Sequence, residues 1–244
     1  MKKYLPFILL VFGILVIIVA IFLIKGKKEA PVEETETVPQ VAFELRPIAS
    51  LTPSEDGHWL KLRIEKIKVN AATLDYELLY KLPDGRTQGV PGTINLTGQA
   101  EIERDLLLGS ESSGKFRYDE GVKDGTLTLR FRNDKGKLSA KFSTDFALLA
   151  GTAELNSPDK KFTYKLDKIP LKTFFVVMGT FGAPDGYPSG MVDEPYGVFS
   201  MKETGLSGVT SLSSGSAYSY SDNQWIKLDS GKSQKIGIFV GVTE

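Results

Sequence analysis

The sequence predicts a single N-terminal transmembrane helix followed by an all-β protein made of antiparallel strands. Three observations lead to this fold class. An unbroken apolar run lies near the N-terminus, and apolar and polar residues alternate with a period of two from about Val41 onward. Turns that contain Gly, Asp or Pro separate the alternating segments at intervals of roughly 8–12 residues.

The apolar run from Leu5 to Ile24 contains no charged or strongly polar side chain. A helix of this length covers about 30 Å, the thickness of the hydrocarbon core of a bilayer. A cleavable signal peptide would have an apolar region of about 7–15 residues and a cleavage site between small residues. This run is longer, and Lys25 ends it. We therefore expect residues 1–28 to be retained as a signal anchor that contacts the lipid bilayer.

The flanking charges bear on the orientation of the anchor. Two lysines precede the run and three follow it, so the positive-inside count is nearly tied. The layout of a short basic start, a long apolar run and an acidic segment favours a single-pass protein of the cell membrane with its C-terminal part outside the cytoplasm. Residues 29–40 carry four glutamates and two prolines. This composition predicts an extended linker.

Three segments of the first half alternate cleanly. Residues 74–82 place Leu and Tyr on one face and charged residues on the other. Residues 126–132 and 138–146 do the same, and the turn at 133–136 between them predicts a β-hairpin. Residues 101–108 fit either a strand or a short helix, and the strand is favoured.

The segment from Trp59 to Val69 begins as a strand, and its alternation changes parity near Glu65, which predicts a β-bulge there. Residues 162–166 and 236–242 also alternate and predict strands. Residues 174–178 are apolar on both faces, which is typical of a strand in the middle of a sheet.

The number of strands suggests two β domains. Residues 41–150 hold about seven strand segments, a pattern that resembles one immunoglobulin-like or fibronectin-like sandwich. Residues 151–244 are richer in Gly and Ser and predict a second β-rich domain. Because no obvious linker marks the boundary near residues 149–156, a single extended β structure is the alternative. The similarity is one of pattern, without a motif that would transfer functional residues.

Composition narrows the classes of function. Lys plus Arg equals Asp plus Glu at 30 each, so no basic excess favours a nucleic-acid partner. The chain has no cysteine, which excludes disulfides, thiol nucleophiles and zinc held by cysteine. Its single histidine, His58, is interpreted as a polar residue at a strand end. No nucleophile-elbow, P-loop or dinucleotide motif is present, so no catalytic residue and no cofactor are predicted.

A long loop offers three carboxylates for a cation. Asp185, Asp193 and Glu194 lie in a segment rich in Pro and Gly, and calcium prefers such oxygen ligands. Their spacing matches no EF-hand, and Asp-Gly and Pro are typical turn formers. The turn is the preferred interpretation.

Five aromatic residues form a candidate ligand surface: Tyr187, Tyr196, Tyr218, Tyr220 and Trp225. Tyr and Trp on a polar surface can stack on sugar rings or anchor a protein partner. The alternative is that Tyr218 and Tyr220 face inward from a strand and that Trp225 closes the core, and this alternative is favoured.

These observations predict a membrane-anchored, non-enzymatic protein that binds or supports an envelope component, with an envelope protein or a glycan as partner. The alternative is an envelope-associated hydrolase that acts on glycans or peptides. A third interpretation is a structural subunit that assembles through its anchor.

Overall fold

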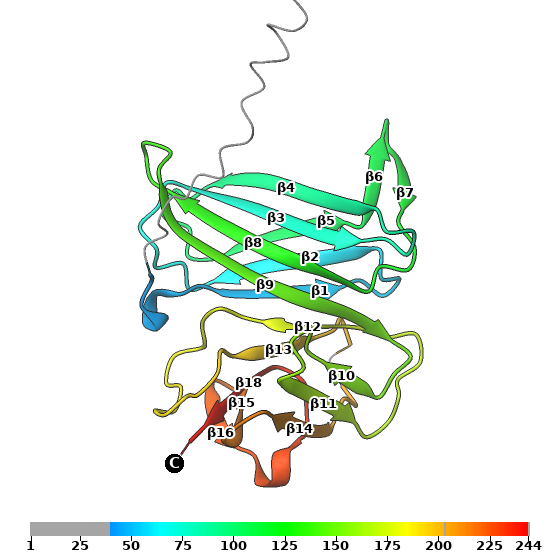
Figure 1. Cartoon of the computed structure of the whole chain (residues 1–244), viewed down its shortest axis with the longest axis vertical. Coiled ribbons are helices and arrows are strands. Elements are labelled where there is room, and N and C mark those ends of the chain that lie inside the picture. The colour runs from blue at the N-terminus through cyan, green and yellow to red at the C-terminus, as the bar shows by residue number, and fades with distance from the viewer. Residues whose placement is uncertain (1–39, 203, 244) are drawn as a thin grey trace, which may run out of the picture. The chain divides into compact units, whose positions relative to one another are not determined.

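The computed structural model describes residues 40–202 and 204–243, which belong to one compact unit, Val38–Glu244 (Figure 1). Among these residues, no helix is long and apolar enough to cross a membrane. The helix predicted over Leu5–Ile24 and most of the linker lie outside the described residues.

The described residues form short antiparallel strands and two short 3-10 helices. The first part contains η1 (Phe43–Leu45), β1 (Ile48–Pro53), β2 (Trp59–Glu65), β3 (Thr73–Lys81), β4 (Thr87–Asn95), β5 (Ile102–Leu107), β6 (Gly109–Ser112), β7 (Lys115–Tyr118), β8 (Asp124–Arg132) and β9 (Leu138–Ala150). The second part contains β10 (Glu154–Asn156), β11 (Phe162–Leu166), β12 (Phe174–Gly179), β13 (Tyr196–Phe199), β14 (Gly208–Leu212), β15 (Ser216–Ser221), β16 (Gln224–Lys227), η2 (Asp229–Gly231), β17 (Lys232–Ser233) and β18 (Ile238–Val242).

A nine-stranded sheet runs through both parts in the order β16-β15-β18-β13-β12-β9-β8-β3-β4. Smaller sheets are β1-β2-β5, β10-β11-β14-β17 and the separate hairpin β6-β7. Every strand pairing in the described part of the chain is antiparallel. The prediction of an antiparallel all-β fold is confirmed for these residues.

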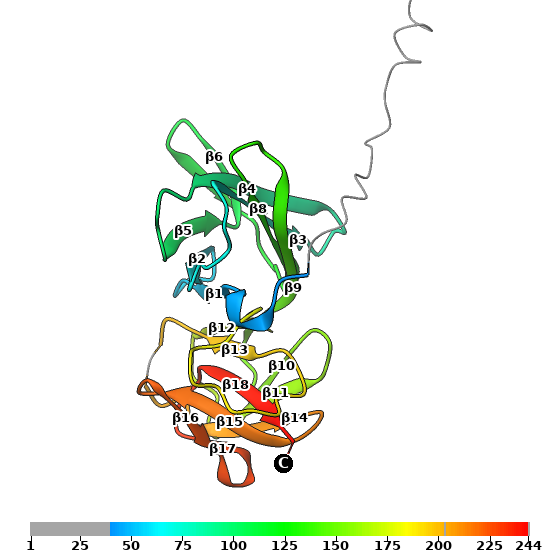
Figure 2. The same ribbon diagram turned by 90° about the vertical axis from the view of Figure 1, so that its left-hand side faces the viewer.

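The strands pack in facing layers. Figure 2 shows β1, β2 and β5 facing β3, β8 and β9, and a first hydrophobic cluster fills the space between these layers. The predicted hairpin of β8 and β9 is confirmed, with Leu127, Leu129 and Phe131 fully buried. Leu74 and Leu78 of β3 are equally buried, as their alternation predicts.

The predicted bulge near Glu65 is wrong. Strand β2 ends at Glu65, and Lys66 has a φ of 56°, a left-handed conformation that stops an extended strand. Ile67 and Val69 follow outside any strand and pack against the first cluster. The change of parity in the sequence therefore marks the end of a strand.

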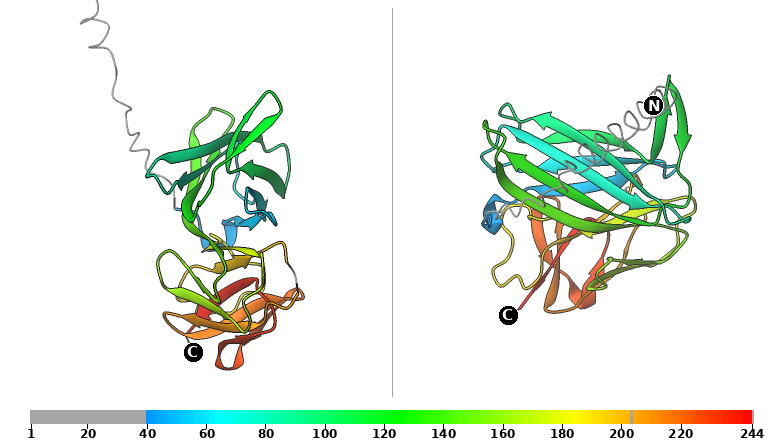
Figure 3. Two further views of the ribbon diagram at one scale, coloured as in Figure 1. Left: turned by 90° about the vertical axis from the view of Figure 1, so that its right-hand side faces the viewer. Right: turned by 45° about the horizontal axis from the view of Figure 1, so that its top comes forward.

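Strand β12 lies between two hydrophobic clusters, which confirms its predicted central position. Val176 and Met178 belong to the first cluster, whereas Phe175 and Val177 belong to the second. Its neighbours in the sheet are β9 and β13. In Figure 3 the strands of the second cluster curl below β12. The predicted division into domains near residue 150 stays a prediction, because the nine-stranded sheet continues across it.

Candidate ligand-binding groove

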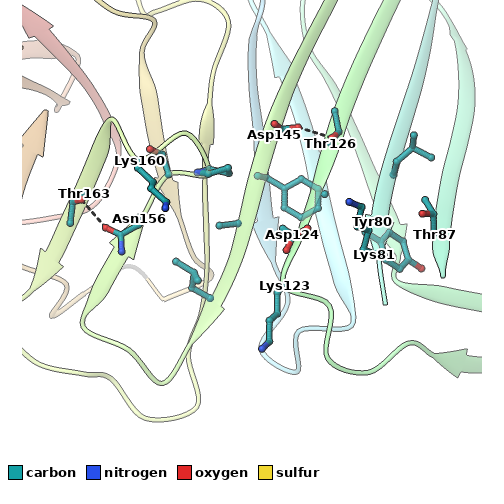
Figure 4. A pocket seen from close by; sticks show the side chains of 17 residues that line it. Tyr80, Lys81, Thr87, Lys123, Asp124, Thr126, Asp145, Asn156, Lys160 and Thr163 are labelled. Carbon is teal, nitrogen blue, oxygen red and sulfur yellow. Dashed lines mark hydrogen bonds between the residues drawn. The ribbon is translucent and has the colours of Figure 1, made fainter. Parts of the chain in front are cut away.

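A groove of about 840 Å³ lies between the ends of β3, β8 and β9 and the β10–β11 hairpin (Figure 4). Its floor is the outer face of the nine-stranded sheet. Far from the groove this face is charged, since Arg132 pairs with Asp75 at 2.8 Å. Inside the groove, the same face presents Leu79, Ala147 and Leu149. The groove therefore has an apolar floor on an otherwise polar sheet face.

Gly125 shapes this floor. A Cβ atom at this position would lie 2.2 Å from the backbone oxygen of Leu79 and 2.6 Å from the ring of Phe146. Because the nearest atom belongs to the paired backbone of β3, a side chain here has no room without shifting the pairing. Glycine is the residue that lets β8 lie this close to both.

Three exposed lysines line the groove. Lys81 ends β3, Lys123 directly precedes β8, and Lys160 lies in the turn between β10 and β11. Within residues 40–202 and 204–243, none of these ammonium groups forms an ion pair or a hydrogen bond. These three unpaired ammonium groups outnumber the two carboxylates described next, and the excess of positive charge at the edge of an apolar floor favours an anionic ligand.

Two carboxylates also line the groove. Asp124 pairs in register with Ala147, and Asp145 pairs with Thr126, so the two acids are diagonal neighbours on one sheet face. Diagonal neighbours lie about 7–8 Å apart, with their Cβ atoms somewhat closer. Asp145 accepts a hydrogen bond of 2.6 Å from the Thr126 hydroxyl.

The predicted aromatic ligand surface is divided among three environments. Tyr196 is only 6% exposed and belongs to the second cluster, where its ring stacks on Phe162. Its hydroxyl donates to the Asp159 carboxylate at 2.6 Å. Burial, and then this hydrogen bond, raise the pKa of Tyr196 well above its ordinary value of 10.0.

Tyr187 is half-buried in the loop. Its ring lies edge-on to Phe43 at 5.1 Å between centroids, and its hydroxyl donates to Glu44. Tyr187 and Tyr196 line a second, more polar groove of about 630 Å³. The structure brings these two predicted residues together, with the ring of Tyr196 committed to packing.

Tyr218, Tyr220 and Trp225 are half-buried and belong to neither hydrophobic cluster. The favoured interpretation that they face the core is therefore wrong. Tyr220 and Trp225 contact each other across β15 and β16, with centroids 5.3 Å apart. Ser219 is the buried residue of this strand. It lies opposite Phe239 of β18, whose large ring already fills the core at this level.

The three loop carboxylates do not converge. Asp185 pairs with Lys66 at 2.7 Å, and Glu194 pairs with Arg46 at 2.8 Å. Asp193 accepts hydrogen bonds from two serine hydroxyls at 3.0 Å. The hydrogen bond and the charge of Lys66 hold the pKa of Asp185 below its ordinary value of 3.8. In the described part of the chain, no group of three or more acidic or histidine side chains is arranged to hold a metal ion.

His58 stacks on Tyr118, with ring centroids 4.3 Å apart. Its Nε2 atom lies 3.9 Å from a carboxylate oxygen of Glu120. These contacts place His58 against the β6–β7 hairpin. Among the described residues, its imidazole forms no hydrogen bond with a serine hydroxyl.

Comparison of the chain with protein-family models, with curated proteins and with solved structures found no match. The candidate site therefore rests on its geometry. Sequence reasoning missed the groove, since its residues come from separate segments between Leu79 and Thr163. A single exposed lysine carries no signal of a site; the signal is the shared location of three.

Proposed function

We propose that this chain is a non-enzymatic binding protein of the cell envelope, held by its N-terminal anchor, which captures an acidic segment of a neighbouring envelope protein in the groove. The observation that carries the proposal is the apolar floor edged by Lys81, Lys123 and Lys160, which have no acidic partner within the described residues. An extended segment with alternating acidic and apolar residues matches both features.

The edge of a sheet adds a second attachment point. Strand β10 is the edge strand of its sheet, and Asn156 of this strand lines the groove. An extended peptide in the groove would therefore reach backbone groups that can accept an added strand.

The test is a titration of the full-length protein, in detergent micelles, with a fluorescein-labelled peptide of alternating Asp and Leu. We expect saturable anisotropy that weakens as salt is added. The triple variant K81Q/K123Q/K160Q should bind about a hundredfold more weakly. The matched control, K135Q/K137Q/K141Q, removes the same charge outside the groove and should bind like the wild type. Equal losses in both variants, or no binding, would contradict the proposal.

The location is a separate part of the proposal. A span such as Leu5–Ile24 cannot be displaced electrostatically, so the protein should stay with membranes after high-salt and alkaline washing. Protease added to intact spheroplasts should digest the folded part. Protection of that part until the membrane is opened would reverse the proposed orientation.

An envelope hydrolase is the second candidate, favoured by the acid pair Asp124 and Asp145. These two carboxylates are diagonal neighbours on one sheet face and both line the groove, and glycoside hydrolysis uses a pair of carboxyl groups that flank the scissile bond. If the chain hydrolyses 4-nitrophenyl glycosides, Asp124→Asn and Asp145→Asn should each abolish turnover without unfolding the protein. His58→Ala should leave that turnover unchanged. Absence of turnover in the wild type favours the binding function.

A further inference from the structure

Two neighbouring loops of the second part present exposed apolar side chains. Residues 167–173 connect β11 to β12, and residues 200–202 follow β13. Leu171 is 89% exposed, Met201 is 55% exposed and Ile169 is 53% exposed. Leu171 and Met201 line one hollow of about 350 Å³, so the two loops lie side by side. Single exposed apolar residues are ordinary, whereas several on adjoining loops mark an interaction surface. We call these three residues the apolar patch.

The local structure holds Leu171 away from the core. Lys172, directly after it, has a φ of 50°, a left-handed conformation that turns the chain sharply. The Thr173 hydroxyl donates to the carbonyl oxygen of Leu171 at 3.1 Å. At the start of the loop, the Ser207 hydroxyl donates to the Asp167 carboxylate at 2.7 Å. Because the loop is held at both ends, the exposure of Leu171 belongs to the fold.

Lysines surround the apolar patch. Each residue of the patch has a lysine directly beside it in the sequence, and none has an acidic residue there. These lysines are Lys168, Lys172 and Lys202. In the part of the chain that the structure describes, their ammonium groups form no ion pair and no hydrogen bond. Glu55 is the only acid among the described residues that line the hollow. Glu203 follows Lys202 in the sequence and lies outside the described residues. The patch is therefore apolar at its centre and basic at its margin.

We propose that the apolar patch lies on the surface of an anionic phospholipid bilayer, an inference that rests on the proposed membrane anchoring. Apolar side chains flanked by lysines enter the boundary between headgroups and acyl chains, to a depth of about 5–10 Å. The alkyl stems of the lysines stay in this apolar layer while their ammonium groups reach the lipid phosphates. A bilayer presents these two layers in the same order, apolar inside and anionic outside.

The length of the linker permits this contact. The described chain begins at Gln40, which lies beside Phe181 just beyond the end of β12. The hollow of the patch lies beside Phe174, at the start of β12. Seven residues of extended chain cover at most about 23 Å, whereas residues 25–40 can extend to about 50 Å. The linker is therefore long enough for the patch to reach the bilayer that holds the anchor. Anchoring also keeps the patch at a high local concentration near that bilayer.

A single cysteine gives a direct test, because the chain contains none. Full-length Leu171→Cys, labelled with nitrobenzoxadiazole, is reconstituted into vesicles of phosphatidylcholine and phosphatidylglycerol, with and without a nitroxide-labelled phosphatidylcholine. We expect the nitroxide to quench the label about twofold. The matched control is Lys135→Cys, which lies in the turn before β9, whereas Phe174 beside the patch pairs with Ala150 at the end of β9. Its label should stay unquenched.

Lipid charge tests the role of the lysines. The variant K168Q/K172Q/K202Q, labelled at Leu171→Cys, should lose about half of the quenching, because each lysine near an anionic surface strengthens the contact. Vesicles of phosphatidylcholine alone should produce a similar loss. The variant K135Q/K137Q/K141Q removes the same charge elsewhere and should keep the quenching of the labelled protein unchanged.

The outcomes separate the patch from the anchor. Resistance of the reconstituted protein to alkaline washing measures anchoring, and a protein that is washed off would overturn both proposals. In an anchored protein, equal emission from the labels at Leu171→Cys and Lys135→Cys would overturn the patch alone. Quenching that ignores lipid charge and the three lysines would overturn the choice of anionic lipid. A label shielded in native membranes but unquenched in vesicles would show that a protein covers the patch, which would also overturn the proposal. The peptide titration of the groove does not involve the patch, so these two proposals fail separately.

Discussion

The hydrogen bond between Tyr196 and Asp159 illustrates how a single contact determines what a side chain can do. Burial acts to raise the pKa of Asp159, but hydrogen bonds from Ser157, Tyr196 and the backbone N–H of Lys161 outweigh it and lower that pKa below 3.8. A carboxylate held in this way stabilises the fold only while it is ionised. The contact turns a predicted ligand residue into a structural one.

Tyr196→Phe should therefore lower the free energy of unfolding by about 1.5 kcal/mol, the usual loss for one hydrogen bond to a charged group. Chemical denaturation at neutral pH measures this change. A variant as stable as the wild type would show that the hydroxyl contributes nothing.

Asp159 also predicts a dependence on pH. Because its pKa is lower in the folded state, its contribution is present above the unfolded value of about 3.9 and is lost as pH falls through the folded pKa. Asp159→Asn removes this contribution. The loss of stability between pH 7 and pH 3, measured by denaturation, should be smaller in the variant than in the wild type, and equal losses would contradict the assignment.

The partial burial of Trp225 is a further feature at the scale of single residues. It is half-buried, and its indole N–H donates to the backbone oxygen of Pro184 at 3.3 Å. Replacing a fully buried aromatic residue by alanine typically lowers the free energy of unfolding by about 3–5 kcal/mol. Trp225→Ala should cost much less than this. Thermal denaturation measures this change, and a loss within that range would restore the core interpretation.

At the scale of elements, the period of two locates strands well wherever one face is covered by a single layer. The hairpin of β8 and β9 follows from its alternation, and β12 follows from its two apolar faces. The period does not predict the buried face of a strand where a residue of the neighbouring strand determines which face is buried. Strand β15 buries Ser219 because Phe239 lies opposite, and the sequence around Tyr218 and Tyr220 contains no trace of that pairing.

Gly125 tests the close approach of β3 and β8. Gly125→Ala should lower the free energy of unfolding by about 2–3 kcal/mol, as expected for overpacking. Adding Phe146→Leu should not restore stability, because the closest atom is the backbone oxygen of Leu79. Denaturation of both variants checks this, and a stable Gly125→Ala protein would mean that the strands can move apart.

For the whole molecule, β12 connects the two hydrophobic clusters. We expect one cooperative thermal transition. Val176→Ala, in the first cluster, and Val177→Ala, in the second, should each lower the free energy of unfolding by about 2 kcal/mol. Both variants should move that same transition to a lower temperature. Scanning calorimetry checks this. Two transitions, each moved by only one of the variants, would instead support the predicted pair of domains.

The groove belongs to this scale too, which is why local patterns could not reveal it. Lys81 and Lys123 reach it from the two ends of a long stretch of chain, and Lys160 reaches it from a turn in the second part. Only the pairing of β3 with β8, of β8 with β9, and the return of β10 and β11 bring these segments together.

The packing of β12 against both hydrophobic clusters limits where the gene for this chain can be divided. A gene fragment ending at Ala150 would encode a first cluster without Val176, Met178 and Phe181, which the remaining part of the gene supplies. A fragment beginning after Ala150 would encode β12 without its neighbour β9. Recombination at that position would separate residues that need each other to fold. We therefore expect relatives of this chain to carry both parts together, rather than either one joined to unrelated sequence.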